Sequence, residues 1–146
     1  GLLAVGKSGI IGCLAAAMQS RLAAVIICWG SGTYASVLRE GIAPGPTGWV
    51  PGLLNWGALP EVCSLIAPRP LFFCVAGEDP NFPTDGFDEL YWRVRQLYLR
   101  IGEGASDRVA AEGLEGDLTQ AFVTEPVDDL ADRLTVGPVA LEAVRG

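Results

Sequence analysis

Histidine is absent from this chain of 146 residues. Its absence removes the commonest general base near neutral pH and the commonest zinc ligand. Charged residues are also scarce, at 18%, whereas apolar residues make up 50% and the mean hydropathy is +0.35. This composition excludes an intrinsically disordered chain, which requires low hydrophobicity and high charge. The length predicts one domain or a piece of one.

Long apolar runs are missing as well. The longest runs, Leu22–Trp29 and Leu71–Ala76, have the length of buried strands and are far too short for a membrane-spanning helix. The net charge of −7 argues against nucleic acid and against anionic membrane surfaces as partners. We therefore expect neither nucleic acid nor a membrane among the partners of this chain.

The cysteines are few and show no C-x-x-C spacing; they are Cys13, Cys28, Cys63 and Cys74. Three of them lie inside apolar runs, which is typical of buried thiols in a reducing compartment. We expect no disulfide framework, no metal site and no cofactor. No signal peptide is visible, so the sequence predicts a cytoplasmic protein. The start at Gly1, without Met, suggests a piece of a longer protein.

Acidic charge is concentrated near the C-terminus. Residues up to Gly102 carry as many bases as acids, whereas residues 103–146 carry ten acids and three bases. Phe122 is the single aromatic residue after Gly102. We expect residues 1–118 to form the folded domain and residues 119–146 to be an acidic, weakly structured segment.

Strand-like and helix-like segments alternate through the first part of the chain. Apolar runs without polar alternation are typical of strands buried on both faces, as in a parallel sheet. The sequence therefore predicts an α/β fold of three to four mostly parallel strands with flanking helices. The expected strands are Leu2–Val5, Leu22–Cys28, Leu71–Ala76 and, as a candidate fourth, Val109–Leu114; the expected helices are Ile10–Ser20, Glu61–Ile66 and Asp85–Ile101, the last with an apolar stripe that runs to Ile101.

Ser8 lies between a predicted strand and a predicted helix. In a nucleophile elbow, a serine on a tight strand-to-helix turn holds its hydroxyl clear of the backbone. The next backbone N–H, here that of Gly9, helps to bind the oxyanion. Gly6 and Gly9 supply the small residues that such a turn needs, whereas Ile10 departs from the G-x-S-x-G pattern. The alternative is that Ser8 simply caps the helix.

A phosphate-binding loop is a further alternative, because Gly1–Ser8 matches G-x-x-x-x-G-K-S. Lys7 would then contact a phosphate. The four intervening residues are Leu-Leu-Ala-Val, which favour a strand over a loop with exposed N–H groups. No acidic residue ends a later apolar strand in the manner of a magnesium ligand. Nucleotide binding is therefore the weaker interpretation.

Asp79 follows the apolar run Leu71–Ala76. A carboxylate at the carboxyl end of a parallel strand lies at the edge where open α/β sheets bind ligands. Serine before aspartate is also the chain order of the α/β-hydrolase triad. The alternative is an aspartate that only forms a turn before Pro80.

Several segments, taken in order, resemble the C-terminal half of an α/β-hydrolase of the acetyl xylan esterase-like and dienelactone-hydrolase-like group. In that family the serine matching Ser8 is the nucleophile, and the aspartate matching Asp79 orients the catalytic histidine. The resemblance implies a serine hydrolase that acts on small-molecule carboxylic esters without a cofactor. It covers roughly residues 1 to 109, through Gly6–Gly9, Arg21–Val25, Ser31–Tyr34, Pro51–Gly57, Leu65–Leu71 and Gly77–Pro83.

The chain departs from that family in two ways. Where the family has its histidine, this chain reads Gly113–Leu118 without one, and the N-terminal half of the family's domain has no counterpart here. Lys7 adjoins Ser8, but neighbours on a tight turn point apart. Glu115 and Asp117 could replace the histidine, yet a carboxylate with a pKa near 4 is a poor base for an alcohol. We expect little or no turnover, and a non-catalytic binding or scaffold module is the alternative function.

The predicted strand Leu2–Val5 has consequences for assembly. In the family the matching strand is paired on both sides, and one of its partners belongs to the half without a counterpart here. The run Leu2–Val5 carries no charge, proline or other device that blocks strand addition. We therefore expect self-association through this edge.

Overall fold

Four parallel strands form one sheet in the order β1-β2-β3-β4. The computed structural model describes residues 1–42, 49–76, 81–102 and 108–114. The predicted α/β class is confirmed, whereas the predicted acidic segment 119–146 lies outside the described residues. The strands are β1 (Leu2–Val5), β2 (Val25–Cys28), β3 (Leu71–Ala76) and β4 (Val109–Leu114); the helices are α1 (Gly9–Met18), α2 (Tyr34–Arg39), α3 (Leu59–Ser64) and α4 (Thr84–Ile101), with single turns η1 (Gly6–Ser8) and η3 (Leu53–Asn55).

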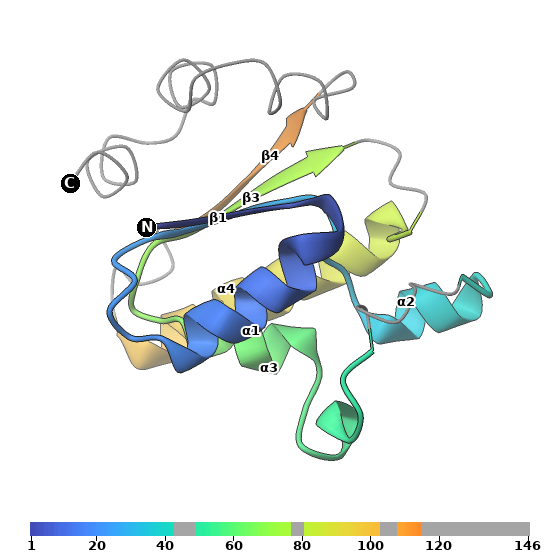
Figure 1. The fold of residues 1–146 in the computed structure, drawn as a ribbon, viewed down its shortest axis with the longest axis horizontal. Coiled ribbons are helices and arrows are strands. Elements are labelled where there is room, and N and C mark those ends of the chain that lie inside the picture. Colours follow the sequence, from blue (N-terminus) through green and yellow to red (C-terminus); the bar gives the residue numbers. More distant parts are fainter. Residues whose placement is uncertain (43–48, 77–80, 103–107, 115–146) are drawn as a thin grey trace.

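The core lies on one face of this sheet. Side chains alternate between the two faces of a strand, and the row Ala4, Ile27 and Phe73 is in register across three strands. All three residues are buried in one cluster with residues of α1, α3 and α4, and these helices lie together against that face (Figure 1). The runs Val25–Cys28 and Leu71–Ala76 thus form the two central strands of the parallel sheet, whereas Leu2–Val5 is an edge strand in which Leu3 is exposed.

The apolar stripe of α4 faces the core over most of the helix. Phe87, Leu90, Val94 and Tyr98 are buried, and the ring of Phe87 meets that of Phe73 edge-on with centroids 5.6 Å apart. The expectation that the stripe extends to Ile101 is wrong: this residue is 53% exposed, because it is the last of the helix and lies a turn beyond the core. Among the described helices, none has the length and apolarity needed to cross a bilayer.

Capping explains where two helices begin. The sequence predicts a helix from Glu61, but α3 begins at Leu59 because the Glu61 carboxylate accepts the Ala58 N–H (2.7 Å) and Pro60 fits the first helical turn. The helix α2 was not predicted. It begins after Thr33, whose hydroxyl accepts the Ser36 N–H (3.4 Å), and at six residues it is too short to show a periodic pattern.

The Arg69 side chain, just before β3, hydrogen-bonds to three segments: the end of α1, the loop before β2 and the turn after α3. Its guanidinium donates to the carbonyl oxygens of Ala16 (2.8 Å), Gln19 (2.9 Å) and Leu22 (3.1 Å), and its Nε donates to that of Ile66 (2.9 Å). Two of these carbonyls belong to the last turn and the end of α1, where backbone acceptors lack helical partners. Leu22 is therefore held outside the sheet, and β2 begins at Val25 instead of the predicted Leu22.

All four cysteines are free and buried, as the sequence predicts for the thiols inside apolar runs. They lie as two pairs. Cys28 and Cys74 are in register on neighbouring strands, and their hydrogen bond, followed by burial, raises the pKa of Cys28. A hydrogen bond with Cys13, followed by burial, raises the pKa of Cys63. The fold therefore holds the thiols of Cys28 and Cys63 in their neutral form.

The buried thiols predict a loss of stability in mild alkali. In the unfolded chain Cys28 and Cys63 ionise near their ordinary value of 9.0, whereas in the folded chain their pKa values are higher. The folded state then binds more protons, so the free energy of unfolding falls as the pH rises above 9, by about 1.4 kcal/mol per pH unit for each thiol. Urea unfolding under reducing conditions at pH 8, 9 and 10 measures this slope. The Cys63→Ala variant should show a shallower slope, and an unfolding free energy that stays constant over this range would contradict the prediction.

Candidate active site

Ser8 lies on the turn that joins β1 to α1, at the carboxyl edge of the sheet. The strand ends at Val5, the single turn η1 covers Gly6–Ser8, and α1 begins at Gly9. Gly6 has a φ of +60°, which a residue with a side chain rarely adopts. Ser8 is exposed at this edge. The strand–turn–helix placement predicted for the candidate nucleophile is therefore present.

The Ser8 hydroxyl turns back onto the strand that precedes it. It donates to the carbonyl oxygen of Val5 (2.8 Å) and accepts the Val5 N–H (3.0 Å). The backbone of Ser8 is relaxed, with φ of −82° and ψ of −3°. Gly6, and not Ser8, therefore adopts the left-handed conformation of this turn. The Ser8 hydroxyl is hydrogen-bonded to the last residue of β1.

The Gly9 amide, the predicted oxyanion donor, is also occupied within the turn. Its N–H donates to the carbonyl oxygen of Gly6. An oxyanion could use this donor only after the single turn Gly6–Ser8 opens. Ser8 and Gly9 are therefore in a closed arrangement in which each already has a backbone partner.

The turn after β2 packs directly against the turn that holds Ser8. A Cβ atom on Gly30 would lie 1.9 Å from the Gly6 carbonyl oxygen, and one on Gly9 would lie 2.4 Å from that of Trp29. Trp29 has a φ of +61°, a costly conformation for a residue with a side chain. Its N–H donates to the Cys74 carbonyl oxygen (2.9 Å). The sequence analysis did not predict this packing of the two turns. The glycine of Trp29-Gly30, directly after a buried run, could have indicated it.

Close packing of α1 on β1 depends on Gly12. A Cβ atom at this position would lie 2.4 Å from that of Ala4 and 3.1 Å from the Ile27 side chain. The elbow pattern wants a glycine at the position of Ile10, where this chain departs from it. In this chain the glycine that lets the helix lie close to the strand is Gly12, two residues after Ile10. Ile10 is buried in the core.

The remaining candidate residues fall where the structure gives no description. Asp79, Glu115 and Asp117 lie outside the described residues, and so does most of the stretch that matches the family's histidine turn. Phe82, the second described residue after Asp79, is buried and contacts the position of Gly32. The approach of Asp79 to Ser8 therefore stays a prediction.

The segment that matches a phosphate-binding loop is extended. Leu2–Val5 is the strand β1, in register with β2 from Leu2↔Val25 to Val5↔Cys28. The Leu2 N–H donates to the Ala24 carbonyl oxygen (2.9 Å). A phosphate loop instead gathers successive N–H groups around its anion. The extended residues Leu2–Val5 do not form such a loop.

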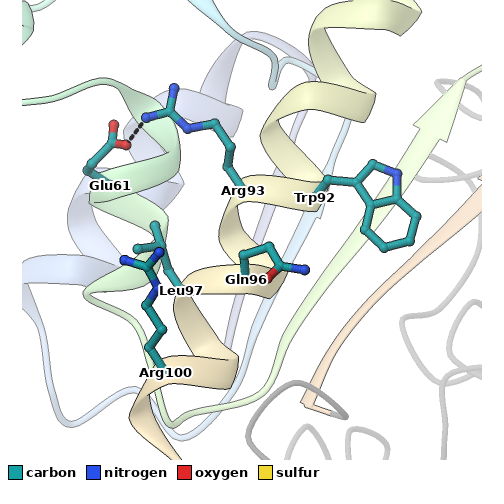
Figure 2. A pocket seen from close by; sticks show the side chains of 6 residues that line it. All are labelled: Glu61, Trp92, Arg93, Gln96, Leu97 and Arg100. Carbon is teal, nitrogen blue, oxygen red and sulfur yellow. Dashed lines mark hydrogen bonds and ion pairs between the residues drawn. The ribbon is translucent and has the colours of Figure 1, made fainter.

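A groove of about 430 Å³ is lined by side chains of α3 and α4 (Figure 2). Two of its charged groups are engaged with each other: Arg93 pairs with Glu61, and Glu61 also accepts the Ala58 N–H. Arg100 is the remaining charged residue of the lining, and the structure gives its side chain no ion pair within the described residues. Its lining residues are Glu61, Trp92, Arg93, Gln96, Leu97 and Arg100.

Comparison with known proteins finds structures that share this fold. No family model matches the sequence, and no curated protein matches it. A carbohydrate esterase family 15 glucuronoyl esterase from Caldicellulosiruptor kristjansonii is similar in structure, with a TM-score of 0.63 at 16% identity over 94% of this chain and 44% of that chain. The glucuronoyl esterase from Solibacter usitatus has a TM-score of 0.62 at 16% identity, over 100% of this chain and 42% of that one.

A third similar structure is the methylesterase BT1017, with a TM-score of 0.51 at 16% identity over 96% of this chain and 31% of that chain. These proteins are α/β-hydrolase-type esterases, and the chain has the fold of part of such a domain. The chain spans less than half the length of each of them.

Proposed function

We propose that this part of an α/β-hydrolase fold carries the serine nucleophile of a carboxylic-ester hydrolase, Ser8, and that the chain by itself turns over esters very slowly or not at all. The observation that supports the nucleophile most is the position of Ser8, exposed on the β1–α1 turn at the carboxyl edge of a parallel sheet. The similar structures bear the names glucuronoyl esterase and methylesterase, which supports ester chemistry.

Ester cleavage at Ser8 would require two local changes. The Oγ atom attacks the ester carbonyl carbon while its proton passes to a base, and the carbonyl oxygen becomes an oxyanion. The Ser8 hydroxyl must first leave the Val5 carbonyl oxygen, and the Gly9 N–H must leave that of Gly6. Ser8 is exposed, so a bound substrate could displace its hydroxyl from Val5, whereas Gly9 is buried and its N–H is released only when the turn Gly6–Ser8 opens.

This chain lacks the histidine that acts as general base in a serine hydrolase. The sequence contains no histidine, and the serine hydroxyl is a weak nucleophile without one. Removal of the histidine from a serine protease lowers kcat on the order of 10⁶-fold. Asp79, which the resemblance assigns to orienting a histidine, would then have no imidazole within this chain to orient. These two facts support the proposal of little or no turnover.

Hydrolysis of p-nitrophenyl acetate tests this proposal. We expect the rate with this chain to equal that of its Ser8→Ala variant, because no group in the chain takes the proton from the hydroxyl. The Lys7→Ala variant is the matched control, since it shows any background acylation of the neighbouring amine. A clear rate that disappears in Ser8→Ala would overturn the claim of little turnover.

Labelling separates the proposed nucleophile from the other candidate functions. We expect a fluorophosphonate to label Ser8 slowly and stoichiometrically, as detected by mass spectrometry, with no label in Ser8→Ala. Absence of labelling together with saturable ATP binding that Lys7→Ala removes would support nucleotide binding instead. Absence of both signals would leave a binding or scaffold module.

A further inference from the structure

Arginine side chains gather at the edge of the sheet where the four strands begin. All strands of this parallel sheet start at one edge, and the last turns of α1 and α4 lie at that same edge (Figure 1). We call this surface the arginine edge. It consists of Arg21 after α1, Arg69 before β3, Arg100 in the last turn of α4 and Arg108 before β4.

Hydrogen bonds connect the segments that carry these four arginines. The Arg108 guanidinium donates to the carbonyl oxygen of Pro68 (3.1 Å), and the Tyr98 hydroxyl of α4 donates to that of Arg69 (3.0 Å). The Arg69 side chain in turn donates to carbonyl oxygens on both sides of Arg21. The arginines therefore surround one hydrogen-bonded group of segments, and all except Arg69 are exposed to solvent.

The described side chains give the arginine edge no acidic partner. The ion pairs in the described part of the chain join Arg39 to Asp85 and join Arg93 to both Glu61 and Glu89, and none includes an arginine of this edge. The C-terminal ends of α1 and α4 bring only about half a negative charge each. Four full positive charges outweigh these two dipoles, so the edge attracts an anionic group.

The complementary charge lies later in the same chain. Residues 1–102 are neutral, whereas residues 103–146 carry the whole net charge of −7. Glu103 and Asp107 lie between Arg100 and Arg108 in the sequence, and two carboxylates neutralise two of the four arginines at most. Residues 125–132, which read EPVDDLAD, contain four further acids and no base.

We propose that residues 125–132 bind the arginine edge of their own chain through their carboxylates. The six residues of β4 lead from the arginine edge to the opposite edge of the sheet, about 20 Å away at 3.3 Å per residue. Asp128 follows Leu114, the last residue of β4, by 14 residues. Even a flexible peptide of this length spans about 20 Å on average, so the acidic segment reaches back to the arginine edge.

The tether makes several weak ion pairs sufficient. An exposed ion pair contributes little by itself, but a segment of the same chain is present at an effective concentration on the order of millimolar. A separate anionic molecule has no such advantage, which favours the chain's own acidic segment as the occupant. This contact does not depend on chemistry at Ser8.

Cross-linking within the whole chain tests the proposal. Leu99→Cys places a thiol beside Arg100, Ala131→Cys places one in the acidic segment, and the four native thiols are buried. We expect a short bismaleimide to join the two new thiols within one chain. Asp128→Lys together with Asp129→Lys should lower this rate at least about fivefold, because the lysines and the arginines repel each other. The rate of Leu99→Cys with N-ethylmaleimide corrects for differences in thiol reactivity.

Leu38→Cys is the matched control for Leu99→Cys. Leu38 is 57% and Leu99 is 47% exposed, and an arginine follows each of them in the sequence. Arg39 already pairs with Asp85 (2.9 Å), so it offers less attraction to a further carboxylate. We expect Leu38→Cys to join Ala131→Cys more slowly, and we expect the two lysines to leave that slower rate unchanged.

Reversal of the charges on both sides should restore the contact. In the variant with the two lysines, Arg100→Glu with Arg108→Glu should return the cross-linking rate to within about twofold of the original. A rate that the lysines leave unchanged would overturn the proposal, since Glu103 and Asp107 would then suffice to neutralise the edge. So would an equal fall at Leu38→Cys, cross-links that form only between chains, or no recovery in a charge-reversed variant whose circular dichroism spectrum stays native.

Discussion

The Gly30→Ala variant should lose more than about 3 kcal/mol of unfolding free energy. A Cβ atom at this position would lie 1.9 Å from the carbonyl oxygen of Gly6 and 2.7 Å from its carbonyl carbon. Backbone atoms of a packed turn cannot swing aside as the end of a side chain can, so the two turns would have to separate. The left-handed φ of +65° adds a cost of about 1 to 2 kcal/mol for a residue with a side chain. Urea unfolding of the variant measures the sum.

Gly6→Ala is the control that separates these two costs. Gly6 has nearly the same φ, +60°, and a Cβ atom there would meet nothing within 4 Å. We expect this variant to lose about 1 kcal/mol, the conformational cost alone. Equal losses of unfolding free energy at the two positions would show that the turns after β1 and β2 are not in close contact. Because Gly6 begins the turn that holds Ser8, a large difference would also identify Trp29-Gly30 as the support of the candidate site.

The Arg69→Ala variant should lose about 3 kcal/mol. Hydrogen bonds from a charged donor contribute about 1.5 to 3 kcal/mol each, and this guanidinium and its Nε reach four carbonyl oxygens. The side chain is half-buried, so water replaces part of what is lost, and the expected value is well below the sum of four bonds. The end of α1 and the start of β2 should lose hydrogen-exchange protection together, since Ala16 and Leu22 share this one donor.

Two variants control for charge and for partial replacement. Arg21→Ala removes the same charge from an exposed position close to the end of α1 and should change stability by less than about 0.5 kcal/mol. Arg69→Lys should recover less than half of the loss, because an ammonium group cannot match the planar fork of donors. Similar unfolding midpoints for Arg69→Ala and Arg21→Ala would show that the carbonyl contacts contribute little.

Much of the fold follows from local patterns in the sequence. The runs Leu2–Val5 and Leu71–Ala76 are strands with the predicted bounds, and Val109–Leu114 is the fourth. Apolar runs without polar alternation are typical of buried strands, and three such runs separated by helices leave few arrangements besides a parallel sheet. The position of Ser8 between the first run and the first helix follows from the same pattern.

Only the tertiary structure decides what surrounds Ser8 and what holds the sheet ends in place. The contact of Gly30 with Gly6 joins turns that are 24 residues apart, and the bond from Arg69 to Ala16 spans 53 residues. A glycine or an arginine in a loop has many local explanations, so its role appears only when a distant backbone comes within a few ångströms. The sequence by itself determines which residues reach the edge of the sheet, because periodicity is local; which atoms meet there depends on how the turns pack.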